Sequence, residues 1–353
     1  MFHECGTFKT AFNELRKKAL RALFSLKNNI IKSSLSIKSL FTLFDTLVKP
    51  VLLYSCQITA PQSDTTKFLC KSPSERSADC FMKKISADPY EKFHLKFIKW
   101  CLSVHPKAAN LGCWGDTGRY PLIFEALKLA ADYHERLKKL NDGSLLLAAY
   151  NEQVSLKLTW YNNMNSLSQL FGSGICNREP VNIRKNLDTL FKTKWHESVD
   201  KSPKLEFYRT LKKEFCYENY LSVTNHKHRA SLTRLRISAH NLFVERGRYC
   251  RPIIERTDRF CTFCKFNLGT HRIEDESHAL LHCPLYSPIR YKIIQSSTTH
   301  DIMSFFTNCN NDFAMNITAC RLAYMILDTH EKYIKYYTDS QHHHTCTGKC
   351  IVM

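Results

Sequence analysis

The chain has 353 residues, enough for two or three domains, and its apolar content of 44% is typical of globular rather than disordered proteins. Only 10 residues are glycine, which argues against a dinucleotide-binding fold, whose turns and phosphate loops depend on glycine. The formal net charge of +19 favours a polyanionic partner, nucleic acid before an anionic membrane surface, over the plain alternative of a basic solvated surface.

The N-terminal part is predicted to begin with two helices. Between residues 12 and 30 the apolar side chains recur at three- and four-residue steps, which predicts an amphipathic helix. A second apolar helix begins at Ile37, and Pro50 is expected to kink or end it. Residues 60–90 are rich in Ser, Asp, Lys and Pro without a clear period, so we expect a long loop there.

The middle of the chain is predicted to be helical as well. Helical patterning resumes at Pro89, and a glycine-containing turn is expected at 112–118. Two further helices are expected, at 121–140 and at 145–171. The sequence Gly-Ser-Gly at the start of 172–180 indicates a linker, and we expect the main domain boundary there.

The last third is predicted to contain helices on both sides of a cysteine-rich segment. Two short helices are expected near 181–197 and 203–216, and a basic helix follows through 229–242. No internal repeat or β-rich region is evident. We therefore expect a mainly α fold, with the cysteine segment as the exception.

Four residues of that segment have the spacing of metal ligands. Cys261 and Cys264 are separated by two residues, so one tight turn can present both thiolates to a single ion. About fifteen residues later, His278 and Cys283 can complete the tetrahedron that Zn²⁺ prefers. Four protein ligands leave no open position for water, which favours a structural zinc site over a catalytic one.

Two questions about this site stay open at the level of sequence. His282 is an alternative ligand to His278, because residues at i and i+4 share a helix face. The acidic residues at 274–276 could orient a ligating imidazole through its second nitrogen. The competing interpretation is chance spacing in a chain that contains 16 cysteines.

Basic and aromatic residues are interleaved just before the cysteine segment. Guanidinium groups clamp phosphates and aromatic rings stack on unpaired bases, so this pattern predicts a nucleic-acid surface, with a solvated basic helix as the alternative. We expect Arg229 and Arg236 to point away from the apolar stripe of their helix, so that replacing either with Ala would cost little stability. The expected contact residues are Arg229, Arg234, Arg236, His240, Arg246, Arg248, Tyr249 and Arg251, with Lys17, Lys18 and Arg21 from the first helix.

The order of these motifs resembles the C-terminal region of LINE-type (non-long-terminal-repeat) retrotransposon reverse transcriptases. The stretches at 231–242, 245–249 and 261–286 carry this resemblance, and its most specific parts are 231–286 and 44–56. Upstream, the stretches at 18–27 and 44–56 look like the segment after the polymerase palm, the thumb, and those at 97–107 and 118–122 look like the connection between the two regions. The thumb-like stretch departs from the family where it reads Ser-Cys-Gln-Ile, because relatives usually carry an acidic residue and a Trp there.

The resemblance implies RNA or DNA binding without chemistry. The polymerase centre needs a Tyr-x-Asp-Asp turn and an upstream Asp to hold two Mg²⁺ ions, and we find neither motif in the sequence, nor an endonuclease domain. We therefore expect no enzymatic activity from this chain alone. The triplet Asp116-Thr117-Gly118 also occurs in aspartic proteases, but the family motif continues through it, so we interpret it as coincidence.

Two alternative functions follow from other features of the chain. One is an accessory part of an RNA-directed DNA polymerase that acts together with a palm-containing reverse transcriptase chain. The other is a membrane-tethered adaptor, because the last four residues fit a prenylation box at Cys350.

The expected location is intracellular, cytoplasmic and/or nuclear, because no secretory signal is visible and most cysteines sit singly in apolar segments, as reduced buried thiols do. No apolar run is long enough for a membrane span. The expected organisation is a thumb-like helical segment at 1–59, a loop at 60–90, a helical connector at 91–171, a linker at 172–180, a basic helical region at 181–249, a zinc-binding module at 250–291, C-terminal helices at 292–338 and a tail at 339–353.

Overall fold

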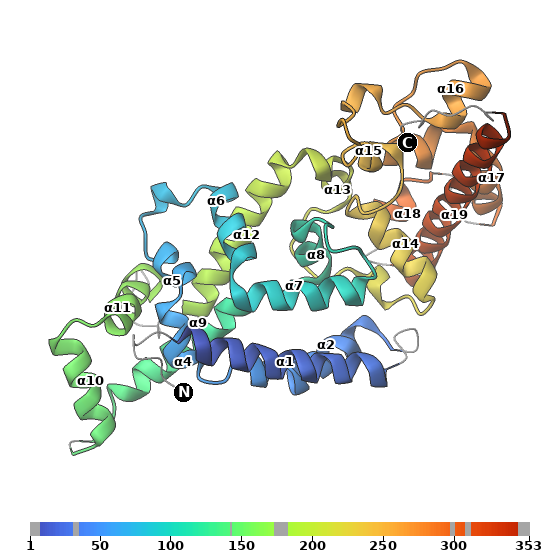
Figure 1. Ribbon diagram of the computed structural model, residues 1–353. Coiled ribbons are helices and arrows are strands. Elements are labelled where there is room, and N and C mark those ends of the chain that lie inside the picture. Colours follow the sequence, from blue (N-terminus) through green and yellow to red (C-terminus); the bar gives the residue numbers. More distant parts are fainter. Residues whose placement is uncertain are drawn as a thin grey trace. The chain divides into compact units, whose positions relative to one another are not determined.

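A computed structural model shows a mainly α protein, as the sequence predicts (Figure 1). It describes residues 8–30, 35–141, 143–172, 183–296, 301–307 and 312–344. Within these ranges the β pairing consists of two isolated bridges, Thr117 with Tyr217 and Phe260 with Ile273. No helix in the described ranges has both the length and the apolar content that a membrane crossing requires.

The chain divides into two compact units. Unit 1 takes its residues from 1–32, 38–98 and 119–201, and unit 2 takes them from 33–37, 99–118 and 202–353. The division therefore falls after Lys201 and not in the predicted linker at 172–180, most of which lies outside the described residues. The reason is that Phe191 of the last unit 1 helix packs its ring against the rings of Phe81 and Phe124.

Unit 1 begins with the two helices that the apolar periodicity predicts. The second helix ends at Leu47, before Pro50, which stands in the first turn of the next helix, where its missing N–H costs nothing. The helical elements of this part are α1 (Lys9–Asn29), α2 (Ile37–Leu47), α3 (Lys49–Leu52) and α4 (Cys56–Thr59).

The loop predicted at 60–90 is wrong. This stretch contains η2 (Ala60–Gln62), α5 (Asp64–Leu69), η3 (Pro73–Glu75) and α6 (Ala78–Ala87). The hydroxyls of Ser63 and Ser77 cap α5 and α6 by accepting hydrogen bonds from backbone N–H groups. These helices are too short to show a clear apolar period, and tertiary packing stabilises them through buried residues such as Phe68 and Phe81.

The predicted glycine turn at 112–118 is helical as well. It forms α8 (Asn110–Thr117), which belongs to unit 2 and ends at Gly118 with a positive φ of 60°. Gly112 is required for packing rather than for a turn, because a Cβ atom there would lie 2.6 Å from Cγ2 of Ile237.

The remaining helices of unit 1 follow the predicted pattern with one interruption. The helix predicted at 145–171 is divided in two, with Lys157 between the halves at a positive φ of 49°. The elements are α7 (Pro89–Leu102), whose last turn belongs to unit 2, α9 (Leu122–Leu137), α10 (Leu145–Ser155), α11 (Thr159–Gly172) and α12 (Ile183–Lys201).

Unit 2 is organised around α14 (His226–Arg236), which packs along the long C-terminal helix α19 (Phe313–His344). The cysteine segment lies between these two helices in the sequence, and it contributes short turns rather than long elements. The other elements of unit 2 are η4 (Pro203–Leu205), α13 (Glu206–Leu211), η5 (Asn219–Ser222), α15 (Phe243–Arg246), η6 (Arg256–Asp258), α16 (Thr262–Leu268), η7 (His278–His282), η8 (Pro284–Tyr286), α17 (Ser287–Gln295) and α18 (Ser304–Thr307).

Candidate metal centre

The four predicted metal ligands lie together in unit 2. One ligand atom each from Cys261, Cys264, His278 and Cys283 falls within 4.8 Å of all the others, and all four residues are buried. The Sγ atom of Cys283 is 3.8 Å from that of Cys261 and 3.9 Å from that of Cys264. The Sγ atom of Cys264 is 3.4 Å from Nε2 of His278. This arrangement can hold one metal ion.

The first cysteine pair is positioned by a short helix and the turn that follows it. Cys261 is the N-cap residue of α16, and Cys264 lies within the helix, so both thiols are held at its first turns. Gly269 ends α16 with a positive φ of 65°, and the backbone N–H of Thr270 donates to the carbonyl of Cys264 at 3.0 Å. The chain then returns alongside itself, where the N–H of Cys261 donates to the carbonyl of Arg272 at 2.7 Å.

The second ligand pair is positioned by a π-helical turn. The N–H of Cys283 donates to the carbonyl of His278, five residues earlier, at 2.8 Å. Asp275 caps the start of this turn by accepting a hydrogen bond from the N–H of His278 at 2.8 Å. The guanidinium of Arg290 donates to the carbonyl of Cys283 at 2.7 Å and thereby holds the end of the turn.

Burial distinguishes the two candidate histidines. His278 begins the π turn and His282 ends it. His278 is buried within the ligand cluster, whereas His282 is exposed and is not part of it. The structure therefore assigns the fourth ligand position to His278.

The electrostatics of the cluster favour a bound cation. Burial, together with the neighbouring thiol of Cys261, raises the pKa of Cys264 to about 11. The hydrogen bond with Cys283, together with burial, raises the pKa of Cys261 even further. Adjacent buried thiolates repel one another, so they form only when a positive ion compensates their charge.

The acidic residues at 274–276 do not orient the ligating imidazole, contrary to the sequence-based expectation. Their contacts hold the backbone and other side chains around the metal centre. Glu274 accepts a hydrogen bond from the N–H of Phe243 at 2.7 Å. Glu276 accepts from the hydroxyl of Ser238 at 2.6 Å and lies 2.9 Å from Nε2 of His240.

Three of the predicted nucleic-acid contacts are buried, which corrects the sequence-based expectation. Arg229, Arg236 and His240 are each at most 5% exposed, so they cannot contact a polyanion at the surface. Arg229 donates to the carbonyl of Val223 at 2.7 Å, and His240 contacts Glu276. For the two arginines the expectation failed because α14 is buried on more than one face, whereas its apolar stripe indicates a single buried face.

Arg236 is the centre of a buried charge network in unit 2. Its Nε atom is 3.2 Å from Oδ2 of Asp116, and its Nη2 atom is 3.2 Å from Oδ1 of the same carboxylate. Glu218 contacts Arg236 at 3.3 Å and also pairs with Lys212. Tyr220 donates its hydroxyl to Asp116 at 2.6 Å. The Asp-Thr-Gly triplet thus contributes a structural carboxylate, a role that sequence reasoning missed.

Other predicted contact residues lie at the surface but differ in how their charge is used. Arg234, Tyr249 and Arg251 are exposed. Arg246 and Arg248 are partly buried, and Nε of Arg248 lies 3.1 Å from Oε2 of Glu245. In unit 1, Lys17, Lys18 and Arg21 are exposed on α1.

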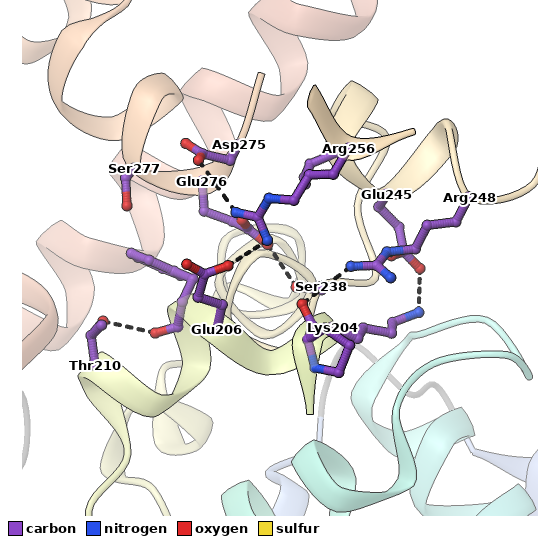
Figure 2. Close-up of a pocket in the computed structure, with 13 residues that line it drawn as sticks. Lys204, Glu206, Thr210, Ser238, Glu245, Arg248, Arg256, Asp275, Glu276 and Ser277 are labelled. Carbon is purple, nitrogen blue, oxygen red and sulfur yellow. Dashed lines mark hydrogen bonds and ion pairs between the residues drawn. The ribbon is translucent and has the colours of Figure 1, made fainter. Parts of the chain in front are cut away.

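Figure 2 shows that the Arg248 pair belongs to a wider cluster of compensated charges around a cavity of about 120 Å³. Lys204 pairs with the same glutamate, Glu245, and Arg256 contacts both Glu206 and Asp275. Each cation in this cluster has an acidic partner. A paired cation attracts a polyanion less strongly than an unpaired cation does. The proposed lipidation site, Cys350, lies outside the described residues.

Further basic and aromatic side chains, which sequence reasoning missed, surround the metal loop. Lys265, Phe266, His271 and Arg272 are all exposed, and the amine of Lys265 lies 5.6 Å from the ring centre of Phe266. Their place in the sequence could have predicted this exposure. Residues between the ligands of a short metal-binding loop have almost no core in which to be buried.

Comparison with known proteins gives no match for this chain, whether among family models, curated proteins or solved structures.

Proposed function

We propose that this chain is a zinc-stabilised protein that binds RNA or DNA and is related to the C-terminal region of LINE-type reverse transcriptases. The observation that carries the proposal is the buried cluster of three cysteines and one histidine beside exposed basic and aromatic side chains. The motif order at 231–286 supports the relationship to reverse transcriptases.

The donor set supports Zn²⁺ as the ion. Three thiolates and one imidazole are the ligands of structural zinc sites, and soft sulfur donors disfavour Mg²⁺ and Ca²⁺. All four donors belong to one segment of 23 residues, from Cys261 to Cys283, so an ion would join the two turns that supply them. The role of the ion is structural, because four protein ligands occupy every position of a tetrahedron.

Exposed cations and aromatic rings within the metal loop and shortly before it in the sequence support a nucleic-acid partner. Lys265, Arg272 and Arg251 supply exposed positive charge, which attracts phosphates. Phe266, with 59% of its surface exposed, and Tyr249, with 47%, supply rings on which unpaired bases can stack.

The test combines metal analysis with binding measurements on the full chain. We expect one zinc per chain by mass spectrometry of the intact protein, and binding of labelled RNA and DNA that weakens steeply between 50 and 200 mM salt. Replacing Arg251 and Arg272 together with Ala should reduce the salt slope by about two units, one for each lost phosphate contact.

The matched control replaces Lys17 and Lys18 of α1, two exposed cations in unit 1. If only this control weakens binding, the nucleic-acid surface is α1 and the metal module has another role. If the folded, zinc-loaded chain binds neither RNA nor DNA, the proposed function is wrong.

A further inference from the structure

A second cavity of unit 2, with a volume of about 290 Å³, lies beside α14 and α19. It is larger than the cavity in Figure 2 and is lined by charged and aromatic side chains from several segments. The residues that matter here are Arg234 of α14, Asn241 after it, and Tyr324, Asp328, His330 and Glu331 of α19.

The cation of this cavity has unused hydrogen-bond donors. Nε of Arg234 donates to the carbonyl of Ser103 at 3.0 Å, which fixes the orientation of the guanidinium group. Its two terminal nitrogens have no hydrogen-bond partner among the described residues. A planar fork held in this way is suited to two acceptors that lie side by side on a ligand.

The acids of the cavity have unused acceptor capacity. Within the described residues, Asp328 receives one hydrogen bond, from Lys332 at 2.6 Å, and Glu331 receives one from Asn241 at 3.1 Å. An ionised carboxylate can accept about four hydrogen bonds, so both residues can accept more. Two carboxylates beside one guanidinium would repel a phosphate, and the cavity is therefore suited to a neutral polar group.

His330 also lines this cavity, and its Nε2 atom lies 3.3 Å from Oε2 of Glu274. It is 2% exposed, and its Nδ1 atom has no hydrogen-bond partner within the described part of the chain. A buried nitrogen without a partner costs stability.

An aromatic wall completes the cavity. Tyr324 lines it, and the ring of Tyr324 is itself held by the imidazole of His228, whose centre is 4.8 Å away at an interplanar angle of 35°. A flat polar ligand can therefore lie against a ring that is already positioned.

We propose that this cavity binds one unpaired guanine base of a single-stranded nucleic acid. Guanine presents two acceptors, O6 and N7, that match the fork of Arg234. On its other edge it presents two adjacent donors, N1–H and N2–H, that one carboxylate can accept. No other common base offers both features. The acids of α19 would recognise the 2-amino group of guanine. The inference rests on the proposed nucleic-acid binding and specifies the base that is read.

The test uses the full, zinc-loaded chain and short labelled strands of adenine and uracil that contain a single guanine. Replacing that guanine with inosine removes only the 2-amino group and should weaken binding about tenfold, since a bidentate base contact contributes about that much discrimination. The double variant Asp328→Asn/Glu331→Gln should bind the guanine and inosine strands equally. Arg234→Lys should keep the affinity for the guanine-free strand and lose the preference for guanine.

Lys227→Ala is the matched control, because it removes an exposed charge from the same helix outside the cavity. It should weaken all strands alike and keep the guanine preference, with circular dichroism as the check on folding. Free guanosine monophosphate should compete only weakly, and binding of it as tight as that of the strand would make a free nucleotide the ligand and overturn the proposal.

The remaining outcomes separate this inference from the proposed function. Equal binding of guanine and inosine strands by the folded wild-type chain would refute the guanine cavity and leave nucleic-acid binding in place. Absence of binding to every strand would refute both.

Discussion

The two compact units place ionisable side chains in their interiors in different ways. Unit 1 contains a polar chain that leads from the core to the surface. Glu91 and His94 are buried, and Nε2 of His94 accepts a hydrogen bond from Arg119 at 3.0 Å. Arg119 then binds Asp45 with two hydrogen bonds of 3.0 and 2.6 Å, and this last carboxylate is 31% exposed.

Unit 2 contains a charge network, centred on Arg236, that is enclosed completely. Asp116 and Arg236 are at most 1% exposed, and Glu218 and Lys212 complete the same network below the surface. When a side chain is removed from the exposed end of the unit 1 network, water can solvate the charge that loses its partner. When one is removed from the enclosed network of unit 2, the remaining charge stays buried without compensation.

The pKa of Asp45 illustrates the open arrangement. Burial alone would raise it, but the hydrogen bonds and charge of Arg119 outweigh that effect and hold the pKa of the carboxyl below its usual range. The comparison therefore predicts large effects of single substitutions in unit 2 and smaller ones at the exposed end of the network in unit 1.

Loss of the metal should produce the largest effect. Structural zinc contributes about 10 kcal/mol or more to the folding of small modules, so Cys264→Ser should unfold the metal module while unit 1 keeps its helices. Hydrogen exchange of the full chain, read by mass spectrometry, can locate the loss. Cys80→Ser, at an exposed cysteine of α6, is the control and should change nothing. Retained protection around α16 in the Cys264→Ser protein would show that the module folds without metal.

Breaking the closed network should have the next largest effect. Arg236→Ala leaves Asp116 and Glu218 buried without their cation, so the free energy of unfolding should fall by about 3–5 kcal/mol. Urea unfolding followed by circular dichroism measures this change. Arg234→Ala, two positions away at an exposed site, should change stability by less than about 0.5 kcal/mol. Similar losses in both variants would contradict the burial of Arg236.

Unit 1 should lose folding stability as the pH falls, because of His134. Burial, aided by the nearby charge of Lys138, lowers the pKa of His134 to about 4. This imidazole is 2% exposed, and its Nε2 atom lies 3.1 Å from the hydroxyl of Tyr150. Because the folded pKa lies below the unfolded one, the stabilisation is fully present above about pH 6.5 and is lost as the pH falls towards 4.

The corresponding slope is at most about 1.4 kcal/mol per pH unit for one proton. Urea unfolding at several pH values, compared between the wild-type chain and His134→Phe, isolates this contribution from those of other titrating groups. Identical pH profiles would mean that His134 does not take up a proton on unfolding.

Breaking the open chain at its exposed end should have the smallest effect. Asp45→Ala leaves Arg119 partly hydrated and still bonded to His94, so the loss should be about 1 kcal/mol. The same substitution should matter less at high salt, because this pair is partly exposed to solvent. A loss as large as that of Arg236→Ala, measured under the same conditions, would remove the distinction between the two networks.

The sequence by itself determined those features that depend on local spacing. The two residues between Cys261 and Cys264 place both thiols on one turn, and this holds whatever the rest of the chain does. The amphipathic period of α1 and the mainly α character have the same origin, since a helix repeats its own contacts every three to four residues. The prediction of the metal cluster and of the fold class is confirmed for this reason.

Tertiary structure alone decided the features that depend on distant partners. Arg236 is buried because Asp116, 120 residues earlier, meets it, and nothing in the neighbourhood of either residue signals that pair. The short helices at 60–90 exist because their apolar residues find a core, not because of their own periodicity. The choice of His278 over His282 also required the tertiary structure, because only the folded chain shows His278 buried in the cluster and His282 exposed.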